Sequence, residues 1–254
     1  METGTAQEDV IGGQEHGPGA LATTAGDFDN RPPMPVTEYE QTVKSVNMGY
    51  DLLFTLTYCL LRALRRPDLD LLVVGAGGGA EIERFLPDNP GWRLTGVDPS
   101  QDMLAVAQAK AERLGVLGQV TLVRGTIEDI PSRGSFDAAT CLLVLHFLPE
   151  AQKRTLLQGI AERLQPEAPV LVASGSRVDD GGVRDDLLGA WQQYGELHGM
   201  PAERMATTID QLMAQQPNMT SEDGHRRLLL DAGFTRVASY FRVMGGGMAA
   251  WIAR

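Results

Sequence analysis

Apolar residues come in short continuous runs that alternate with helical stretches over most of the chain. Runs of this kind are typical of strands buried on both faces of a parallel sheet. They recur at intervals of roughly 20 to 35 residues, with helical stretches at 78–86, 100–115 and 150–165 between them. The five runs are LDLLVVGAG (69–77), RLTGVDPS (93–100), VTLVRGT (120–126), FDAATCLLVLH (136–146) and PVLVASGS (169–176). Such alternation predicts βαβ units in a doubly wound sheet.

The end of the chain breaks this alternation. Residues 221–233 predict a helix that stops at Gly233. Two further strands follow, at 235–243 and 247–254, joined through Met244, Gly245 and Gly246. A short glycine-containing connection favours an antiparallel pair. The pattern therefore predicts an α/β fold with a mostly parallel, seven-stranded sheet, an antiparallel edge strand and a helical cover.

The remaining segments set the domain organisation. Residues 1–35 are rich in Gly and Pro and poor in large apolar groups, which predicts a flexible N-terminal tail. Residues 36–66 show two helical stretches interrupted near Met48 and Gly49. An insert at about 177–218, also helical by pattern, separates the fifth strand from the last helix. We expect one domain over residues 36–254.

Composition and charge exclude several classes of protein. The 22 Lys and Arg against 33 Asp and Glu give a formal net charge of -11, which disfavours a nucleic-acid partner. The most apolar stretch, Leu52 to Leu61, is half of what a membrane-spanning helix needs. With an acidic N-terminus in place of a targeting signal, a cytoplasmic protein is expected. Cys59 and Cys141 lie in apolar runs and predict buried free thiols, and their spacing suggests no metal site.

The glycine-rich turn after the first strand is the main chemical feature. It reads LLVVGAGGGAE, and it places Gly75, Ala76 and Gly77 between a strand and a helix. Glycines there let a ligand approach the backbone closely, and Gly75, Gly77 and Ala80 match a dinucleotide-binding pattern. The alternative is that the glycines only allow the strand and the helix to pack tightly.

An acid ends the second strand about twenty residues further on. Asp98 lies where a carboxylate accepts both hydroxyls of an adenosyl ribose. A nicotinamide cofactor and S-adenosylmethionine both carry that ribose, so Asp98 does not separate them. Asp98 has an alternative reading too, as a helix N-terminal cap together with Ser100.

The residues that follow favour S-adenosylmethionine. Met103, in PSQDML, can cover one face of an adenine, and Thr126 and Ile127, in RGTIEDIP, can border the other. With FDAATCLLVLHFLP as fourth strand and a final antiparallel pair, residues from about 49 to 254 resemble the class I S-adenosylmethionine-dependent methyltransferases. The resemblance implies a Rossmann-like fold with this cofactor. It implies cofactor contacts from Tyr50, Gly75, Ala76, Gly77, Asp98, Pro99, Met103, Thr126, Ile127 and Leu142.

A nearer resemblance is to the carboxy-S-adenosylmethionine synthase branch. GYD (49–51), LVLHFL (143–148) and LLLDAGF (228–234) carry it, and it implies that Tyr50 lines the cofactor pocket. That branch holds an extra carboxylate with an Arg in the late insert. Here residues 205–224 contain no Arg, and only Arg204 precedes them, which argues for ordinary S-adenosylmethionine. The family also has an acid two residues before the first loop glycine. Val73 occupies that position here, which suggests either that another residue makes this contact with the cofactor or that the cofactor binds more weakly.

Candidate catalytic residues are few because the chain has four histidines. His146 ends the predicted fourth strand at the ligand-binding edge of the sheet, as a base or an acceptor contact. The alternative is a hydrogen-bonded structural histidine. His198 lies near Trp191 in the insert, in a pocket wall or in a core. His225 is expected at the surface, and His16 lies in the tail.

The function predicted from the sequence is transfer of a methyl group from S-adenosylmethionine to a small molecule, with His146 and His198 as catalytic candidates and no metal. Two alternatives remain. One is a synthase or transferase that uses a modified S-adenosylmethionine, and the other is a non-catalytic nucleotide-binding protein on the same fold. A homodimer is compatible with the sequence.

Overall fold

The computed structural model describes residues 36–131, 134–177, 182–215, 219–243 and 247–254. The predicted tail at 1–35 and the predicted connection through 244–246 lie outside these residues, as do parts of the insert. The helices are α1 (Val36–Val46), α2 (Tyr50–Arg62), α3 (Ala80–Phe85), α4 (Gln101–Arg113), α5 (Glu150–Arg163), α6 (Arg184–Leu197), α7 (Ala202–Gln215) and α8 (Glu222–Asp231). Single 3-10 turns are η1 (Leu117–Gln119), η2 (Ile127–Asp129) and η3 (Leu145–Phe147).

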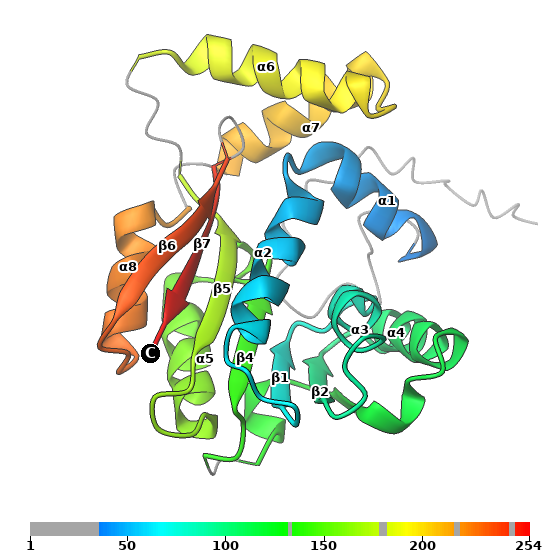
Figure 1. Cartoon of the computed structure of the whole chain (residues 1–254). Coiled ribbons are helices and arrows are strands. Elements are labelled where there is room, and N and C mark those ends of the chain that lie inside the picture. Colours follow the sequence, from blue (N-terminus) through cyan, green and yellow to red (C-terminus); the bar gives the residue numbers. More distant parts are fainter. Residues whose placement is uncertain (1–35, 132–133, 178–181, 216–218, 244–246) are drawn as a thin grey trace, which may run out of the picture.

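Seven strands form one sheet in the order β3-β2-β1-β4-β5-β7-β6 (Figure 1). They are β1 (Asp70–Val74), β2 (Arg93–Asp98), β3 (Val120–Arg124), β4 (Ala138–Leu142), β5 (Val170–Gly175), β6 (Val237–Arg242) and β7 (Met248–Ala253). The first five strands pair in parallel, and β7 pairs antiparallel with both β5 and β6. The predicted fold class is confirmed. The antiparallel strand β7 lies between β5 and the edge strand β6.

The sheet separates two hydrophobic cores. Successive residues of β1 point to opposite faces, so that Leu71 and Val73 join one core and Leu72 and Val74 the other. This explains why the strand has a continuous apolar sequence. Helices α2, α3 and α4 cover the first face, and α5 and α8 cover the second.

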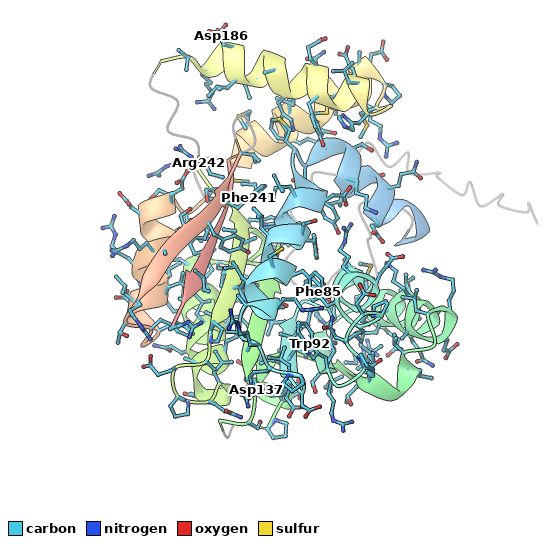
Figure 2. All side chains as sticks on the ribbon, viewed as in Figure 1. Phe85, Trp92, Asp137, Asp186, Phe241 and Arg242 are labelled. Atoms are coloured by element: carbon cyan, nitrogen blue, oxygen red, sulfur yellow. The ribbon has the colours of Figure 1, made fainter. Side chains whose placement is uncertain are left out.

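Aromatic side chains anchor α2 on the first face. The Tyr58 ring stacks on Phe85 with centroids 5.6 Å apart and meets Trp92 edge-on at 6.0 Å. Figure 2 shows Phe85 and Trp92 together at this end of the molecule. Buried aromatic pairs stabilise beyond the area that they bury. The lower half of α2 is therefore fixed to the sheet, and its N-terminal end extends towards the edge where the strands end.

A separate cover lies beyond that edge. Helices α6 and α7 sit above α1 and the start of α2 (Figure 1). They share a small core with α1, built from Val46, Trp191, Met200, Met205 and Ile209. Trp191 Nε1 donates a hydrogen bond to the Val46 carbonyl at 2.7 Å, which ties α6 to the end of α1.

The strand order creates a crevice at the centre of the sheet. From β1 the chain runs outward through β2 and β3, then returns to place β4 on the other side of β1. In open α/β sheets ligands bind at such a switch point, outside the carboxyl ends of the strands. The crevice here lies beyond the ends of β1 and β4. Among the described residues, no helix has the length and apolar character that a bilayer span requires.

Candidate functional site

A cavity of about 520 Å³ fills this crevice, a volume within the range of small-molecule sites. All ten residues that the sequence predicted as cofactor contacts line it. They come from the start of α2, the turn after β1, the end of β2 and the start of α4, η2 and the end of β4. Residues far apart in the sequence thus meet around one cavity.

The glycine loop has the backbone shape that only glycine adopts easily. Gly75 and Gly77 have φ angles of 73° and 48°. The amides of Gly75 and Ala76 both donate to the Val97 carbonyl, at 2.9 and 3.1 Å. A side chain at Gly75 would meet Val144 Cγ2 at 2.3 Å, so packing alone requires this glycine. At Gly77 the nearest atom would be Met103 Cε at 3.3 Å, on the cavity wall.

Asp98 holds the loop and the next helix together. Its Oδ2 accepts from the Gly77 amide and its Oδ1 from the Ser100 amide, both at 2.9 Å. Ser100 in turn caps α4, its Oγ accepting from the Met103 amide at 3.2 Å. Asp98 also lines the cavity. The capping and ligand-binding readings of Asp98 are compatible.

Apolar groups form the part of the cavity beyond Asp98. Met103 on α4 and Ile127 in η2 both line it and are both buried. Thr126 caps η2 in a reciprocal arrangement with Asp129, which fixes the turn that presents Ile127. Buried apolar side chains on the cavity wall suit an aromatic ring such as adenine.

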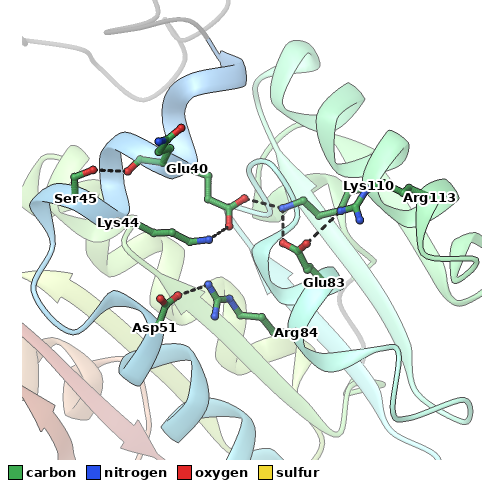
Figure 3. A network of polar contacts seen from close by, with 9 residues as sticks. Glu40, Lys44, Ser45, Asp51, Glu83, Arg84, Lys110 and Arg113 are labelled. Atoms are coloured by element: carbon green, nitrogen blue, oxygen red, sulfur yellow. Dashed lines mark hydrogen bonds and ion pairs between the residues drawn. The ribbon is translucent and has the colours of Figure 1, made fainter. Parts of the chain in front are cut away.

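Helix α1 closes the cavity from the side of the cover. Glu40, which lines the cavity, pairs with Lys44 and with Lys110 of α4, each at 2.8 Å (Figure 3). Lys110 also contacts Glu83 of α3 at 3.1 Å. Partial burial by itself would raise the pKa of Glu40, but hydrogen bonds and charge from Lys110 and Lys44 outweigh it and lower the pKa to about 2. We call Glu40, Lys44, Glu83 and Lys110 the α1 clasp.

The sequence did not single out three groups on the cavity wall. Glu81 follows the glycine loop on α3, and Glu128 lies in η2. Leu143, just after β4, has a positive φ of 62°, an uncommon conformation for a leucine. The position of Glu81 straight after the loop was the signal available for it. No local pattern distinguishes Leu143 or Glu128 from their neighbours.

His146 lies beside the cavity wall rather than on it. The expected strand stops at Leu142, and His146 falls in η3, so it does not end β4 as the sequence predicted. Its Nδ1 accepts from the Gly175 amide at 3.3 Å, which agrees with the structural alternative. Burial, then the neighbouring His225 and Lys153, lower the pKa of His146 to about 4. Its catalytic role stays a prediction.

His198 lies outside the main cavity. It is exposed at the end of α6, with its ring stacked on Tyr194 at 4.0 Å and its Nδ1 2.8 Å from the Tyr194 carbonyl oxygen. His198 and Tyr194 line a second hollow together with Tyr50 and Lys44. Tyr50 borders both spaces and is the one predicted site residue common to them. The structure therefore does not bring His198 and His146 together.

Two further predictions are wrong. His225 was expected at the surface, but it is 1% exposed, because α8 packs it against Trp251 with ring centroids 4.9 Å apart. Cys59 was expected to be buried, but it lies on the exposed side of α2, whereas Cys141 on β4 is buried. Cys59 lies in an apolar stretch of sequence and His225 lies beside two arginines. Neither type of neighbour indicates which side of its helix the residue occupies.

Residues 71–167, which contain the glycine loop, Asp98, η2 and β4, match the methyltransferase domain family. The chain is similar to methyltransferases over this region. Its resemblance to S-adenosylmethionine-dependent methyltransferases is thereby confirmed. The matched region holds every predicted cofactor contact except Tyr50.

Relatives with assigned names agree with this methyltransferase domain. A carboxy-S-adenosyl-L-methionine synthase from Wolinella succinogenes is 30% identical over 164 residues, covering 64% of this chain and 65% of its own. A ubiquinone biosynthesis O-methyltransferase from Cronobacter sakazakii is 30% identical over 109 residues, 42% of each chain. The chain thus spans less than two thirds of the length of the curated relatives it matches.

Solved structures share the fold of the methyltransferase domain. A SAM-dependent methyltransferase from Aquifex aeolicus superposes with a TM-score of 0.55 at 17% identity, over 87% of this chain and 98% of that one. A likeness at this level of identity concerns the fold. It supports the Rossmann-like sheet predicted from the sequence.

Proposed function

We propose that the protein binds S-adenosylmethionine in the central cavity and transfers its methyl group to a small-molecule acceptor. The observation that carries the proposal is the contact between Asp98 and the Gly77 amide, two residues that line that cavity. It fixes a carboxylate and a side-chain-free backbone segment next to each other, as an adenosyl ribose requires. The remaining predicted cofactor contacts border the same space.

The charge of the cavity supports this ligand over a nicotinamide dinucleotide. Four carboxylates, those of Glu40, Glu81, Asp98 and Glu128, line it. Among the described lining residues there is no Lys or Arg. A pyrophosphate would face this acidic wall without a cationic partner, whereas a sulfonium and an ammonium group are favoured by it.

The chemistry requires alignment more than acid–base catalysis. S-adenosylmethionine, when bound, supplies an already activated methyl group. The chain's own contribution is to hold an acceptor in line with that group and to exclude water. Leu143, Phe147 and Leu148, which follow β4 and line the cavity, are the apolar groups that we assign to the acceptor side.

Calorimetry tests the proposal directly. S-adenosylhomocysteine should bind to the purified protein, and NAD should not. Incubation with S-adenosylmethionine and candidate acceptors should then give a product whose mass has increased by one methyl group. Binding of NAD, or failure to bind S-adenosylhomocysteine, would contradict the proposal.

A second candidate function is use of a modified S-adenosylmethionine. The identity to the Wolinella synthase favours it, and Tyr50, part of the shared GYD stretch, lines the cavity. Against it, a ligand with an extra carboxylate would find only acids among the described titratable side chains that border the space, apart from Tyr50. Arg204 is exposed on α7 and does not line the cavity. Product mass separates the two functions.

We further propose small-molecule metabolism in the cytoplasm as the setting, and a homodimer as the assembly. The net charge of -11 argues against a polyanionic acceptor. Size-exclusion chromatography with light scattering tests the assembly.

A further inference from the structure

Glu81 is a buried carboxylate on the wall of the cavity. It lies in the first turn of α3, directly after the glycine loop, and is 4% exposed. Its Oε1 accepts from Thr140 Oγ1 at 3.4 Å, a long contact. Among the described residues, no Lys, Arg or His forms an ion pair with it. Burying an ionised carboxylate costs free energy unless a cation or several hydrogen bonds compensate.

The cations nearest to Glu81 are engaged by other acids. Arg84, one turn further along α3, pairs with Asp51 at 2.6 Å and lies over the Phe54 ring at 4.9 Å. Lys110 is held in the α1 clasp (Figure 3). Neither comes within ion-pair distance of Glu81, although both lie near enough to favour its charged form weakly. A positive partner for Glu81 must therefore come from the cavity.

The contact with Thr140 places the Glu81 carboxylate next to an unusual position of the sheet. Val73 of β1 is paired with Thr140 of β4 in the parallel register. Side chains of paired residues in neighbouring strands project to the same face. Glu81 thus brings its carboxylate from α3 to the face and level of Val73, where this chain has an apolar residue in place of the acid expected from its resemblance.

We propose that Glu81 binds the α-ammonium group of the cofactor's amino-acid end, and that binding is coupled to ionisation of this carboxyl group. The inference rests on the proposed function and adds to it a residue and a pH dependence. Asp98 and Glu81 then contact two different parts of the bound cofactor: Asp98 receives the ribose hydroxyls and Glu81 the ammonium group.

The coupling follows from the surroundings of the free site. Burial raises the pKa of Glu81 to about 7, against smaller opposing effects of its own backbone, Thr140, Arg84 and Lys110. Near neutral pH the empty site therefore contains a substantial fraction of protonated carboxyl. An ammonium group at hydrogen-bond distance favours the carboxylate, so the carboxyl O–H bond breaks and its proton passes to solvent. Affinity should rise as pH increases through about 7.

Other charged groups around Glu81 do not supply this behaviour. On β4 the Cys141 thiol projects to the opposite face of the sheet from Thr140, and burial, followed by the charge of Glu81, raises the pKa of Cys141 to about 12. From α1, Glu40 is held ionised by its lysines, and from α2, Asp51 pairs with Arg84. Glu81 is the group in this cluster whose charge changes near neutral pH.

A pair of ligands isolates the ammonium contact. S-adenosylhomocysteine carries the amino-acid end, and 5′-methylthioadenosine keeps the adenosine and the sulfur but lacks it. Glu81→Gln should weaken S-adenosylhomocysteine binding by about 10- to 100-fold, as loss of a charge-assisted hydrogen bond does, and leave 5′-methylthioadenosine binding unchanged. Glu112→Gln is the control, since it removes the same charge from an exposed position on α4 that contacts Gln108 and does not line the cavity. It should alter neither affinity by more than about twofold.

Proton release from the unmodified protein provides a second test that needs no variant. Calorimetry of S-adenosylhomocysteine binding at about pH 7, in buffers of different ionisation enthalpy, should show about half a proton released per ligand bound, since about half of the Glu81 carboxyls are protonated in the empty site at that pH. The release should be absent with 5′-methylthioadenosine. Glu81→Gln should abolish the release that accompanies S-adenosylhomocysteine binding.

Each remaining outcome has a defined meaning. Equal loss of both ligands in a folded Glu81→Gln variant would assign Glu81 to the shape of the cavity and overturn the inference. Unchanged affinity for S-adenosylhomocysteine, or equal proton release with both ligands, would also overturn it while leaving the proposed function intact. If the unmodified protein binds neither ligand, the proposed function fails, and this inference fails with it.

Discussion

Asp98 combines two tasks that sequence reasoning treats as alternatives. Its two oxygens receive the Gly77 and Ser100 amides, which fixes the glycine loop against the start of α4. The same oxygens border the cavity. A ligand hydroxyl would therefore meet a carboxylate that is already oriented, and little conformational entropy would be lost on binding.

We predict that Asp98→Ala weakens S-adenosylhomocysteine binding by roughly 30- to 1000-fold, because two charge-assisted hydrogen bonds are lost. Calorimetry measures the affinity. Ser100→Ala is the control, since it removes the α4 cap but no expected ligand contact. It should lower stability by about 1 kcal/mol and leave the affinity unchanged. Equal affinity of a folded Asp98→Ala protein and the unmodified one would remove Asp98 from the site.

We predict that Gly77→Val blocks cofactor binding while the core stays folded. A valine at φ 48° is strained, and its side chain would project to the cavity wall beside Met103. Gly115→Val is the matched control. Gly115 has a φ of 71° with no atom near its Cβ position, so that variant introduces strain alone. Comparable cofactor affinities in the two variants would mean that Gly77 is needed only for its backbone conformation and for packing.

At the scale of elements, the cover is held to the sheet by few contacts. The α1 clasp links α1 to α3 and α4 through ion pairs, and the Trp191 hydrogen bond links α6 to α1. Within the α1 clasp, the ion pair between Glu40 and Lys110 joins α1 directly to α4. Opening of this cover would give an acceptor access to the cavity, and closing would exclude water.

We predict that S-adenosylhomocysteine slows amide hydrogen exchange at residues 39–53 and 191–213, because the ligand contacts Tyr50 and stabilises the closed cover. The sheet strands exchange slowly already and should change less. Glu40→Gln should reduce the protection at residues 39–46 in the free protein, since it weakens the clasp. Mass spectrometry of peptic fragments measures both effects. Protection limited to the glycine loop and Asp98 would indicate an open site with no moving cover.

Strands and loops with a local signal could be predicted, and contacts between elements could not. The apolar runs predict β1 and β2, because burial on both faces of the sheet dictates the composition of these strands. The glycine turn predicts the cavity wall between them. The end of β4 is different. Leu143 turns the chain with a positive φ that no residue type there demands, and this turn moves His146 off the sheet edge. Glu40 lines the cavity and pairs with a lysine 70 residues away, a contact that no local pattern indicates.

At the scale of the whole molecule, three buried titratable groups make stability depend on pH in opposite senses. Burial lowers the pKa of His146 and of His225 to about 4. The unfolded chain therefore binds more protons there, and these histidines make unfolding free energy rise with pH between about 4 and 6.5. Glu81, with its pKa raised to about 7, acts the other way between about 4.5 and 7.

We predict that the free energy of unfolding of the ligand-free protein rises with pH from 4.5 to 6.5, since two histidines oppose one carboxyl. His225→Phe should lower this slope by about 1.4 kcal/mol per pH unit, the equivalent of one proton. Glu81→Gln should raise it by a similar amount. Urea denaturation followed by circular dichroism at several pH values measures the slopes. His198→Phe, at an exposed position, is the control, and a slope unchanged in all three variants would contradict the assignment.

The small core shared by α1, α6 and α7 has a consequence for how such a protein can diversify. Its members, from Val46 to Ile209, pack on one another, and the two large cores of the sheet are built from other residues. Substitutions that reshape the cover can therefore be compensated within the cover, without disturbing the strands that hold the glycine loop and Asp98. The same cofactor-binding loops can in this way be combined with different helical covers. A change of acceptor during evolution then need not pass through an unstable intermediate or one that no longer binds the cofactor.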